Sequence, residues 1–253
     1  MIKSGLVSIT FRQLTPRQIV DLVAQSGLDA VEWGGDVHVP HGDVAQARAV
    51  RQMTEDAGMT VASYGSYYRV GHGEPVPFEA VVDSAVELGA PLIRVWAGKQ
   101  GSDKADASYW DRVVEDSRAI GDMAQQAGIV VAYEYHGNAL TDTNATTLKL
   151  LQDVAHDNVK TYWQPPSGLA ADVNLSDLAA ILPWLTNVHV FSWRTIDGKR
   201  ERMLLDAKTG EWAQYLAQVA TTGRDHYAMI EFVRDNEPEN FLKDAETLKM
   251  WLT

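Results

Sequence analysis

The most constraining feature of this sequence is a repeated unit: an amphipathic helix pattern, a glycine and a short apolar run. Four copies are plain, and their glycines, Gly27, Gly58, Gly89 and Gly128, are spaced 31, 31 and 39 residues apart. Each glycine suits the left-handed position that ends a helix. The runs that follow are rich in Val and Ile, as expected for strands buried on both faces. A period of this length predicts a repeated helix–strand architecture.

Four further strand patterns extend this architecture over the chain. Strand and helix patterns that alternate indicate a parallel sheet, and eight units favour a closed (β/α)8 TIM barrel, which usually needs about 250 residues. We therefore predict an α/β fold with one domain spanning residues 1–253. The further strands are expected over residues 3–10, 159–163, 187–191 and 227–232.

Helix start signals agree with this arrangement. Ser, Thr, Asp and Asn favour the residue before a helix, and proline favours its first position. The unit over 167–183 is the weakest, because its helix pattern is short. Capping residues precede three other expected helices: Thr15 with Pro16 before 17–26, Asp43 before 44–57, and Thr143 or Asn144 before the helix that runs to Val154.

The composition excludes several classes of protein. The chain has no cysteine, so it forms neither disulfides nor thiolate metal sites. Its formal net charge of −12 disfavours nucleic acid as a partner, and the basic run 199–202 is expected to be a solvated loop. No stretch approaches the ~20 apolar residues of a membrane span, and residues 1–11 lack the pattern of a signal peptide. A cytoplasmic enzyme without a membrane partner is expected.

Three expected strands end in a side chain that can bind a metal. Glu134 and Glu231 follow apolar runs at the ends of the fifth and eighth strands, and His189 lies near the end of the seventh. TIM barrels carry their chemistry at these carboxyl ends. A buried carboxylate needs a cation beside it. Two carboxylates and one imidazole suit Mn²⁺, with Mg²⁺ or Zn²⁺ as alternatives.

A structural interpretation of the same residues remains open. A buried Glu on a barrel strand can pair with Arg94 or Arg194 in an ion pair, and a single buried His is often only a hydrogen-bonded core residue. Their shared position at the catalytic face of the barrel favours the metal site over these alternatives.

The sequence resembles the xylose isomerase-like TIM barrels, the superfamily that includes sugar phosphate isomerases and epimerases and the AP endonucleases of family 2. The likeness covers essentially the whole chain, and the order of the motifs carries it. They are Glu32-Trp33, residues 134–142, residues 187–191, residues 203–206 through Trp212, Tyr215-Leu216, and residues 230–232.

The resemblance implies one metal, often Mn²⁺, held by Glu, Asp, His and Glu from strands five to eight. Glu134, His189 and Glu231 match three of these positions. The Asp position falls on Gln164, which departs from the family pattern. A glutamine carbonyl can ligate a metal, but the site has one negative charge fewer, which lowers metal affinity and makes a bound metal a stronger Lewis acid.

The resemblance also implies chemistry at a sugar or polyol carbon beside a carbonyl. A metal on the carbonyl and a neighbouring hydroxyl stabilises the charge that forms when a proton leaves. Glu134 and Glu231 would serve as base and acid, and His136 would transfer hydroxyl protons. Our first hypothesis is a metal-dependent isomerase or epimerase. The second is a lyase or dehydratase acting on a keto-sugar, an inosose or a keto-glycoside, and the third is a non-catalytic sugar-binding or complex-forming subunit with a decayed metal site.

Several aromatic and polar residues near the strand ends are candidates for substrate binding. Indole faces suit the apolar face of a sugar ring, although tryptophans at these positions equally fit a core. A small sugar or polyol is the expected partner, and the sequence leaves homo-oligomerisation open. The candidates are Trp33, His38, Trp96, Lys99, Trp163, Trp193 and Arg194.

Overall fold

A computed structural model describes residues 1–73, 75–166 and 168–253. Eight parallel strands close into a barrel in the order β1-β10-β7-β6-β5-β4-β3-β2, so the predicted (β/α)8 fold is confirmed. These strands are β1 (Ile2–Val7), β2 (Ala30–Gly34), β3 (Thr60–Arg69), β4 (Leu92–Trp96), β5 (Val130–Tyr133), β6 (Val159–Trp163), β7 (Leu185–Val190) and β10 (His226–Ile230).

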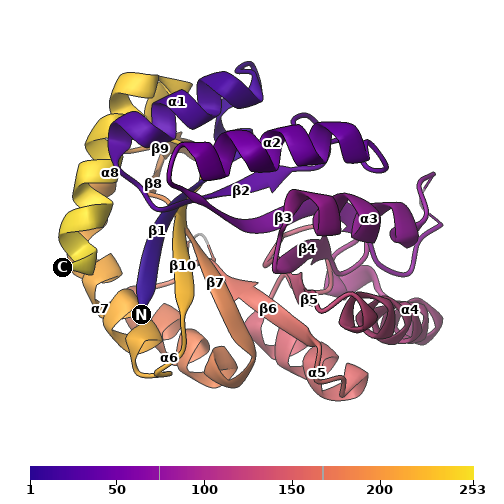
Figure 1. The fold of residues 1–253 in the computed structure, drawn as a ribbon. Helices are drawn as coiled ribbons and strands as arrows, with labels where there is room; N and C mark the ends of the chain where they lie inside the picture. Colours follow the sequence, from indigo (N-terminus) through magenta and orange to yellow (C-terminus); the bar gives the residue numbers. More distant parts are fainter. Residues whose placement is uncertain (74, 167) are drawn as a thin grey trace.

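Helices surround the barrel on the outside (Figure 1). Apolar residues on the outward face of each strand pack against them in the larger of two hydrophobic clusters. No helix in the described part of the chain combines the length and apolar character needed to cross a membrane. The helices are α1 (Pro16–Ser26), α2 (Val44–Asp56), α3 (Phe78–Leu88), α4 (Ala107–Gln126), α5 (Asn144–Val154), α6 (Ala171–Ile181), α7 (Thr209–Ala220) and α8 (Pro238–Leu252).

The helix ends follow from local sequence. Thr15 and Gln18 form a capping box at the start of α1, and Gly27 ends this helix with a φ of 68°. Asp43 caps α2 through the backbone N–H of Gln46, as predicted. At α5 the capping residue is Thr143, one of the two candidates. These ends fix where each strand begins and therefore which residues reach its carboxyl end.

Two segments differ from the sequence prediction. The first strand ends at Val7, and residues 8–11 form a 3-10 helix whose Ser8 hydroxyl accepts the Gly34 N–H at 2.9 Å. The basic run 199–202 is not a loop, because it pairs as β9 (Lys199–Arg202) with β8 (Trp193–Ile196) in an antiparallel hairpin after β7. A two-residue turn at Asp197 and Gly198, both with positive φ, joins the two strands.

Candidate metal centre

The period of two along each strand brings distant polar residues together inside the barrel. Small or apolar side chains such as Ala30, Leu92, Ala132 and Met229 belong to one buried cluster. Alternate residues of a barrel strand face its interior, so the residue two positions further along each strand faces the same interior one layer higher. These residues are Glu32, Arg94, Glu134 and Glu231.

Three of the predicted ligands converge at this level. Glu134, His189 and Glu231 each offer one ligand atom, and these atoms lie within 4.8 Å of one another. The three residues are 4%, 0% and 5% exposed. Buried carboxylates beside an imidazole form a donor set that a divalent cation would neutralise. The group is therefore able to hold a metal ion, as the sequence predicted.

Gln164 presents an oxygen to the same set. Its amide nitrogen donates to the Tyr135 carbonyl at 2.6 Å, which leaves its Oε1 3.2 Å from Nδ1 of His189. Oε2 of Glu231 lies 3.5 Å from the same nitrogen. Two ligand atoms at right angles around a cation, each about 2.1 Å from it, lie roughly 3 Å apart. The spacing therefore fits a metal bound through Nδ1, and the ligand role of Gln164 remains a prediction.

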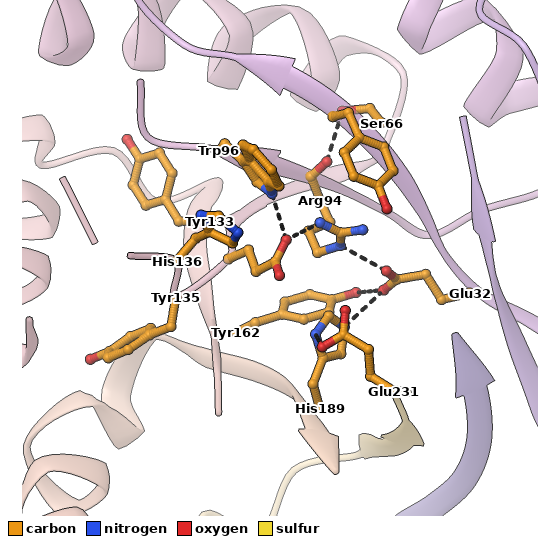
Figure 2. A network of polar contacts seen from close by, with 12 residues as sticks. Glu32, Ser66, Arg94, Trp96, Tyr133, Tyr135, His136, Tyr162, His189 and Glu231 are labelled. Atoms are coloured by element: carbon orange, nitrogen blue, oxygen red, sulfur yellow. Dashed lines mark hydrogen bonds and ion pairs between the residues drawn. The ribbon is translucent and has the colours of Figure 1, made fainter. Parts of the chain in front are cut away.

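A buried ion network surrounds this set, and it includes Glu32, which the sequence did not indicate as a site residue. Arg94 donates from Nε to Oε1 of Glu32 at 2.7 Å and from Nη1 to Oε2 of Glu134. Trp96 donates its indole N–H to the same oxygen of Glu134 at 2.6 Å. Figure 2 shows Arg94 at the centre of this network, between Glu32 and Trp96. The ion pair with Arg94 that the sequence left open is thus present within the metal-binding group.

Charges in the network shift two pKa values. Burial by itself raises the pKa of Glu32, but Arg94 and then His189 outweigh it and hold this pKa well below its usual range. Burial by itself lowers the pKa of His189, but the carboxylates of Glu231 and Glu32 raise it to about 10. In the metal-free protein the imidazole is therefore a cation between two carboxylates. A bound metal would replace its proton.

A cavity of about 610 Å³ opens above the metal-binding group. Glu134, Glu231 and Gln164 line it, as do the predicted site residues His136, Trp96 and Trp193. His136 stacks on Trp96, with the ring centroids 4.1 Å apart and the planes at 20°. The residue after the metal ligand Glu231, Phe232, also lines the cavity and has a φ of 58°.

Other predicted substrate residues lie elsewhere. Trp33 and Trp163 are fully buried between the barrel and its helices, because they are one residue out of phase with the inward-facing Glu32 and Tyr162. His38 is buried between the Ser8 hydroxyl and the Leu14 carbonyl. These three predictions are corrected to core positions. Lys99 is exposed in the loop after β4, where its backbone N–H donates to Tyr109. Arg194 pairs with Glu201 on the hairpin and lines a neighbouring cavity.

Three further residues of the cavity wall were not predicted as site residues. Arg12 pairs with Asp36 and donates to the Tyr67 hydroxyl at 3.0 Å. Tyr67 has a φ of 58°, a left-handed conformation that is uncommon for a bulky residue and turns it into the cavity wall. Arg200 lies over the ring of Trp193. The signal that could have indicated them is position alone: Arg12 follows β1, Tyr67 lies near the end of β3, and Arg200 lies on the hairpin after β7.

The model of one protein family, the xylose isomerase-like TIM barrel, matches residues 20–251. The chain belongs to this family. A curated relative, the 3-dehydroshikimate dehydratase of Bacillus anthracis, is 27% identical over 208 aligned residues, and the match covers 74% of this chain and 70% of the relative.

Solved structures of family members have the same fold. The probable 3-DHS dehydratase involved in petrobactin synthesis from B. anthracis aligns with a TM-score of 0.83 at 21% identity, over 98% of this chain and 99% of that one. A D-psicose 3-epimerase aligns with a TM-score of 0.72 at 18% identity, over 99% of this chain and 97% of that one. A xylose isomerase-like TIM barrel protein from Mycobacterium smegmatis in complex with magnesium aligns with a TM-score of 0.75 at 15% identity, over 100% of this chain and 98% of that one. At these identities the likeness establishes the fold alone.

Proposed function

We propose that the protein is a divalent-metal-dependent lyase that removes water from a hydroxylated cyclic ketone, with 3-dehydroshikimate as the first substrate to test. The observation that carries this proposal is the unequal environment of the two carboxylates, Glu134 and Glu231, that line the cavity. Epimerisation by two carboxylates needs both of them free to exchange protons. Dehydration needs one base and one proton donor for the leaving hydroxyl.

Glu134 is held as a ligand rather than left free as a base. One of its oxygens accepts hydrogen bonds from both Arg94 and Trp96, and these donors hold the carboxylate in one orientation. The other oxygen is left for a metal. None of the hydrogen bonds among the described side chains ends on the carboxylate of Glu231, whose Oε2 lies 3.5 Å from His189. With Oε2 of Glu231 as the ligand atom, its Oε1 has no hydrogen bond from the described side chains, so Glu231 is the better base.

His136 is placed to supply the second proton. The backbone N–H of Asn138 donates to its Nδ1 at 3.3 Å, so the neutral ring carries its proton on Nε2. Stacking on Trp96 holds the ring at the cavity wall. The Nε2–H can then donate to a hydroxyl of a bound substrate, which is the requirement for a general acid in elimination.

The proposed reaction balances with these two residues. The C–H bond beside the carbonyl breaks, Glu231 takes the proton, and the electron pair moves toward the carbonyl oxygen. The C–O bond of the β-hydroxyl then breaks as the electrons return to form a C=C bond. The imidazolium form of His136 gives the proton with which the group leaves as water, and the ring becomes neutral. A divalent metal at Glu134, His189 and Glu231 would act as a Lewis acid toward the carbonyl oxygen. With dehydroshikimate, one further enolisation leaves an aromatic dihydroxybenzoate.

The name that two of the comparisons share supports the choice of substrate. Both the curated relative and a solved structure from B. anthracis carry the name of a 3-dehydroshikimate (3-DHS) dehydratase. The sequence by itself favoured an isomerase or epimerase and placed the lyase second. The pairing of Glu134 with Arg94 reverses this order, because it removes one of the two carboxylates from proton transfer.

The test is turnover of 3-dehydroshikimate by the Mn²⁺-loaded protein, followed by the ultraviolet absorbance of the aromatic product. We expect turnover that a chelator abolishes and Mn²⁺ restores. Glu231→Gln should lower kcat about 100-fold or more, because it removes the base. Glu239→Gln, which changes an exposed carboxylate on α8, should leave kcat unchanged. Absence of aromatic product from the metal-loaded protein would remove dehydroshikimate as the substrate.

A metal-dependent epimerase is the second candidate, because Glu134 and Glu231 both reach the cavity, and a D-psicose 3-epimerase shares the fold. Incubation of the Mn²⁺-loaded protein with ketohexoses in heavy water distinguishes the two. Deuterium incorporation beside the carbonyl, with no elimination product from any substrate, supports the epimerase. If the purified protein binds no divalent metal and gains no activity from Mn²⁺, both enzymatic proposals are wrong.

A further inference from the structure

We propose that Glu32 is a positioning residue of the metal centre: it sets the tautomer of His189 and, through Arg94, the orientation of Glu134. The inference rests on the proposed function in one respect, because it takes Glu134, His189 and Glu231 to bind a divalent metal. It concerns a carboxylate that touches neither metal nor substrate.

Glu32 lies beneath the cavity rather than in its wall. It is fully buried in the middle of β2, and it is not among the described residues that line the cavity. Its Oε2 accepts hydrogen bonds from the Ser63 hydroxyl at 2.7 Å and the Tyr162 hydroxyl at 2.9 Å. Its Oε1 accepts the Nε–H of Arg94. A carboxylate with this many donors stays ionised and has one fixed orientation.

The fixed carboxylate faces the nitrogen of His189 that points away from the ligand set. Nε2 of His189 lies 3.6 Å from Oε2 of Glu32, an ion-pair distance, and it has no hydrogen-bond partner among the described residues. Nδ1 faces Gln164 and Glu231. A histidine that binds metal through one nitrogen must carry its proton on the other, and a carboxylate beside that second nitrogen favours this tautomer. Glu32 therefore leaves the lone pair of Nδ1 directed at the ligand set.

The second arm of the network runs from Glu32 through Arg94 to Glu134. Arg94 bonds both carboxylates, so its charge is shared between them, and Glu134 keeps negative charge for a metal. The position of Gly65 allows this arrangement. A Cβ at Gly65 would lie 2.6 Å from Nη2 of Arg94 and 3.0 Å from Oε1 of Glu32. Any larger residue there would press on a guanidinium that two ion pairs already hold in place.

A purely structural ion pair between Glu32 and Arg94 would stabilise the barrel without affecting the ligands. The two roles predict different results. A structural role lowers stability alone when Glu32 is changed. A positioning role also lowers metal affinity and changes which nitrogen of His189 carries the proton, even with no substrate present.

The experiment compares the wild type with Glu32→Gln, which keeps the shape of the side chain and removes its charge. Mn²⁺ affinity is measured by electron paramagnetic resonance. The tautomer of His189 is observed by NMR in Zn²⁺-loaded protein labelled with ¹⁵N-histidine, because the charged ring of the metal-free protein carries a proton on both nitrogens. We expect affinity to fall about 10- to 100-fold and the Nε2–H tautomer to become less populated. Asp244→Asn is the matched control, because it makes the same carboxylate-to-amide change at a buried residue of α8 that lies outside this network. It should bind Mn²⁺ within about threefold of the wild type.

Several outcomes separate the alternatives. Equal Mn²⁺ affinity in Glu32→Gln and the wild type overturns the inference and leaves the proposed function standing. If Glu32→Gln does not fold, the wild type decides: Zn²⁺-loaded protein in which His189 carries its proton on Nδ1 contradicts the positioning role, and a proton on Nε2 supports it. If the wild type binds no divalent metal, the proposed function fails together with the inference. Reduced affinity without dehydration of any substrate supports the role of Glu32 and rejects the proposed reaction.

Discussion

The metal affinity of this site should depend steeply on pH, because His189 must lose a proton before it can bind a metal. Its pKa is raised to about 10 by the carboxylates of Glu231 and Glu32. In the metal-free protein this charge contributes stability that is fully present below the ordinary histidine pKa of about 6.5. The contribution is lost as the pH rises through about 10. Metal binding has the opposite dependence and strengthens as the pH rises.

The size of the effect follows from the separation between the working pH and this pKa. Each pH unit below about 10 makes metal binding about tenfold weaker, which is about 1.4 kcal/mol per unit. At pH 7 the proton therefore costs about 4 kcal/mol of binding free energy. Between pH 6.5 and pH 8.5 the apparent association constant for Mn²⁺ should rise about 100-fold.

Isothermal titration with Mn²⁺ measures this dependence. Titrations in buffers of different ionisation enthalpy give the number of protons released, which should be close to one at pH 7.5. His189→Gln should bind weakly with a flat pH profile, whereas His136→Gln, which changes a histidine outside the ligand set, should keep the steep one. A wild-type affinity that stays constant from pH 6.5 to 8.5, with no proton released, would refute this reasoning. It would mean that His189 does not exchange a proton for the metal.

Three further predictions test the network, the chemistry and the fold. Arg94→Met should lower the free energy of unfolding of the metal-free protein by about 3–5 kcal/mol in urea denaturation, because two buried carboxylates lose their cation; an effect no larger than that of Arg48→Met, at an exposed pair, would contradict this. His136→Ala should lower kcat about 100- to 10,000-fold, whereas loss of Mn²⁺ affinity would instead make it a ligand. Burial raises the pKa of Asp244 to about 7, so its contribution to stability is lost as the pH rises from about 4 to 7. The free energy of unfolding of Asp244→Asn, relative to that of the wild type, should therefore rise by about 2–3 kcal/mol between pH 5 and pH 8. Thermal unfolding in which the variant and the wild type differ equally at both pH values would refute this.

The fold and the group of three residues that can hold a metal could be predicted from the sequence for a physical reason. Parallel strands buried on both faces read as short apolar runs, and their glycine-ended helices set a regular period. All strands of a TIM barrel end at the same face, so a polar residue that ends an apolar run belongs at that face whatever its partners are. Glu134, His189 and Glu231 satisfied this condition individually, before any contact between them was known.

The sequence could not predict which of the other strand-end residues face inward. Inward and outward positions differ by a single residue, and the ladders shift register between Val31 and Glu32 and between Thr161 and Trp163. These shifts lie beside Trp33 and Trp163, the two tryptophans whose predicted position was wrong. Only the closed barrel decides which residues of a strand face inward, because the pairing with both neighbouring strands sets the orientation of each residue.

The ion network was also decided only by the tertiary structure. Glu32 and Arg94 lie 62 residues apart in sequence, and the pair is recognisable only once β2, β3 and β4 lie side by side. By itself the sequence determined the barrel and the donors that a metal needs. The closed barrel determined which cation holds Glu134, which carboxylate faces His189, and which carboxylate is left without a hydrogen bond from the described side chains. These contacts depend on distances of a few ångströms between strands that the chain connects only through its helices.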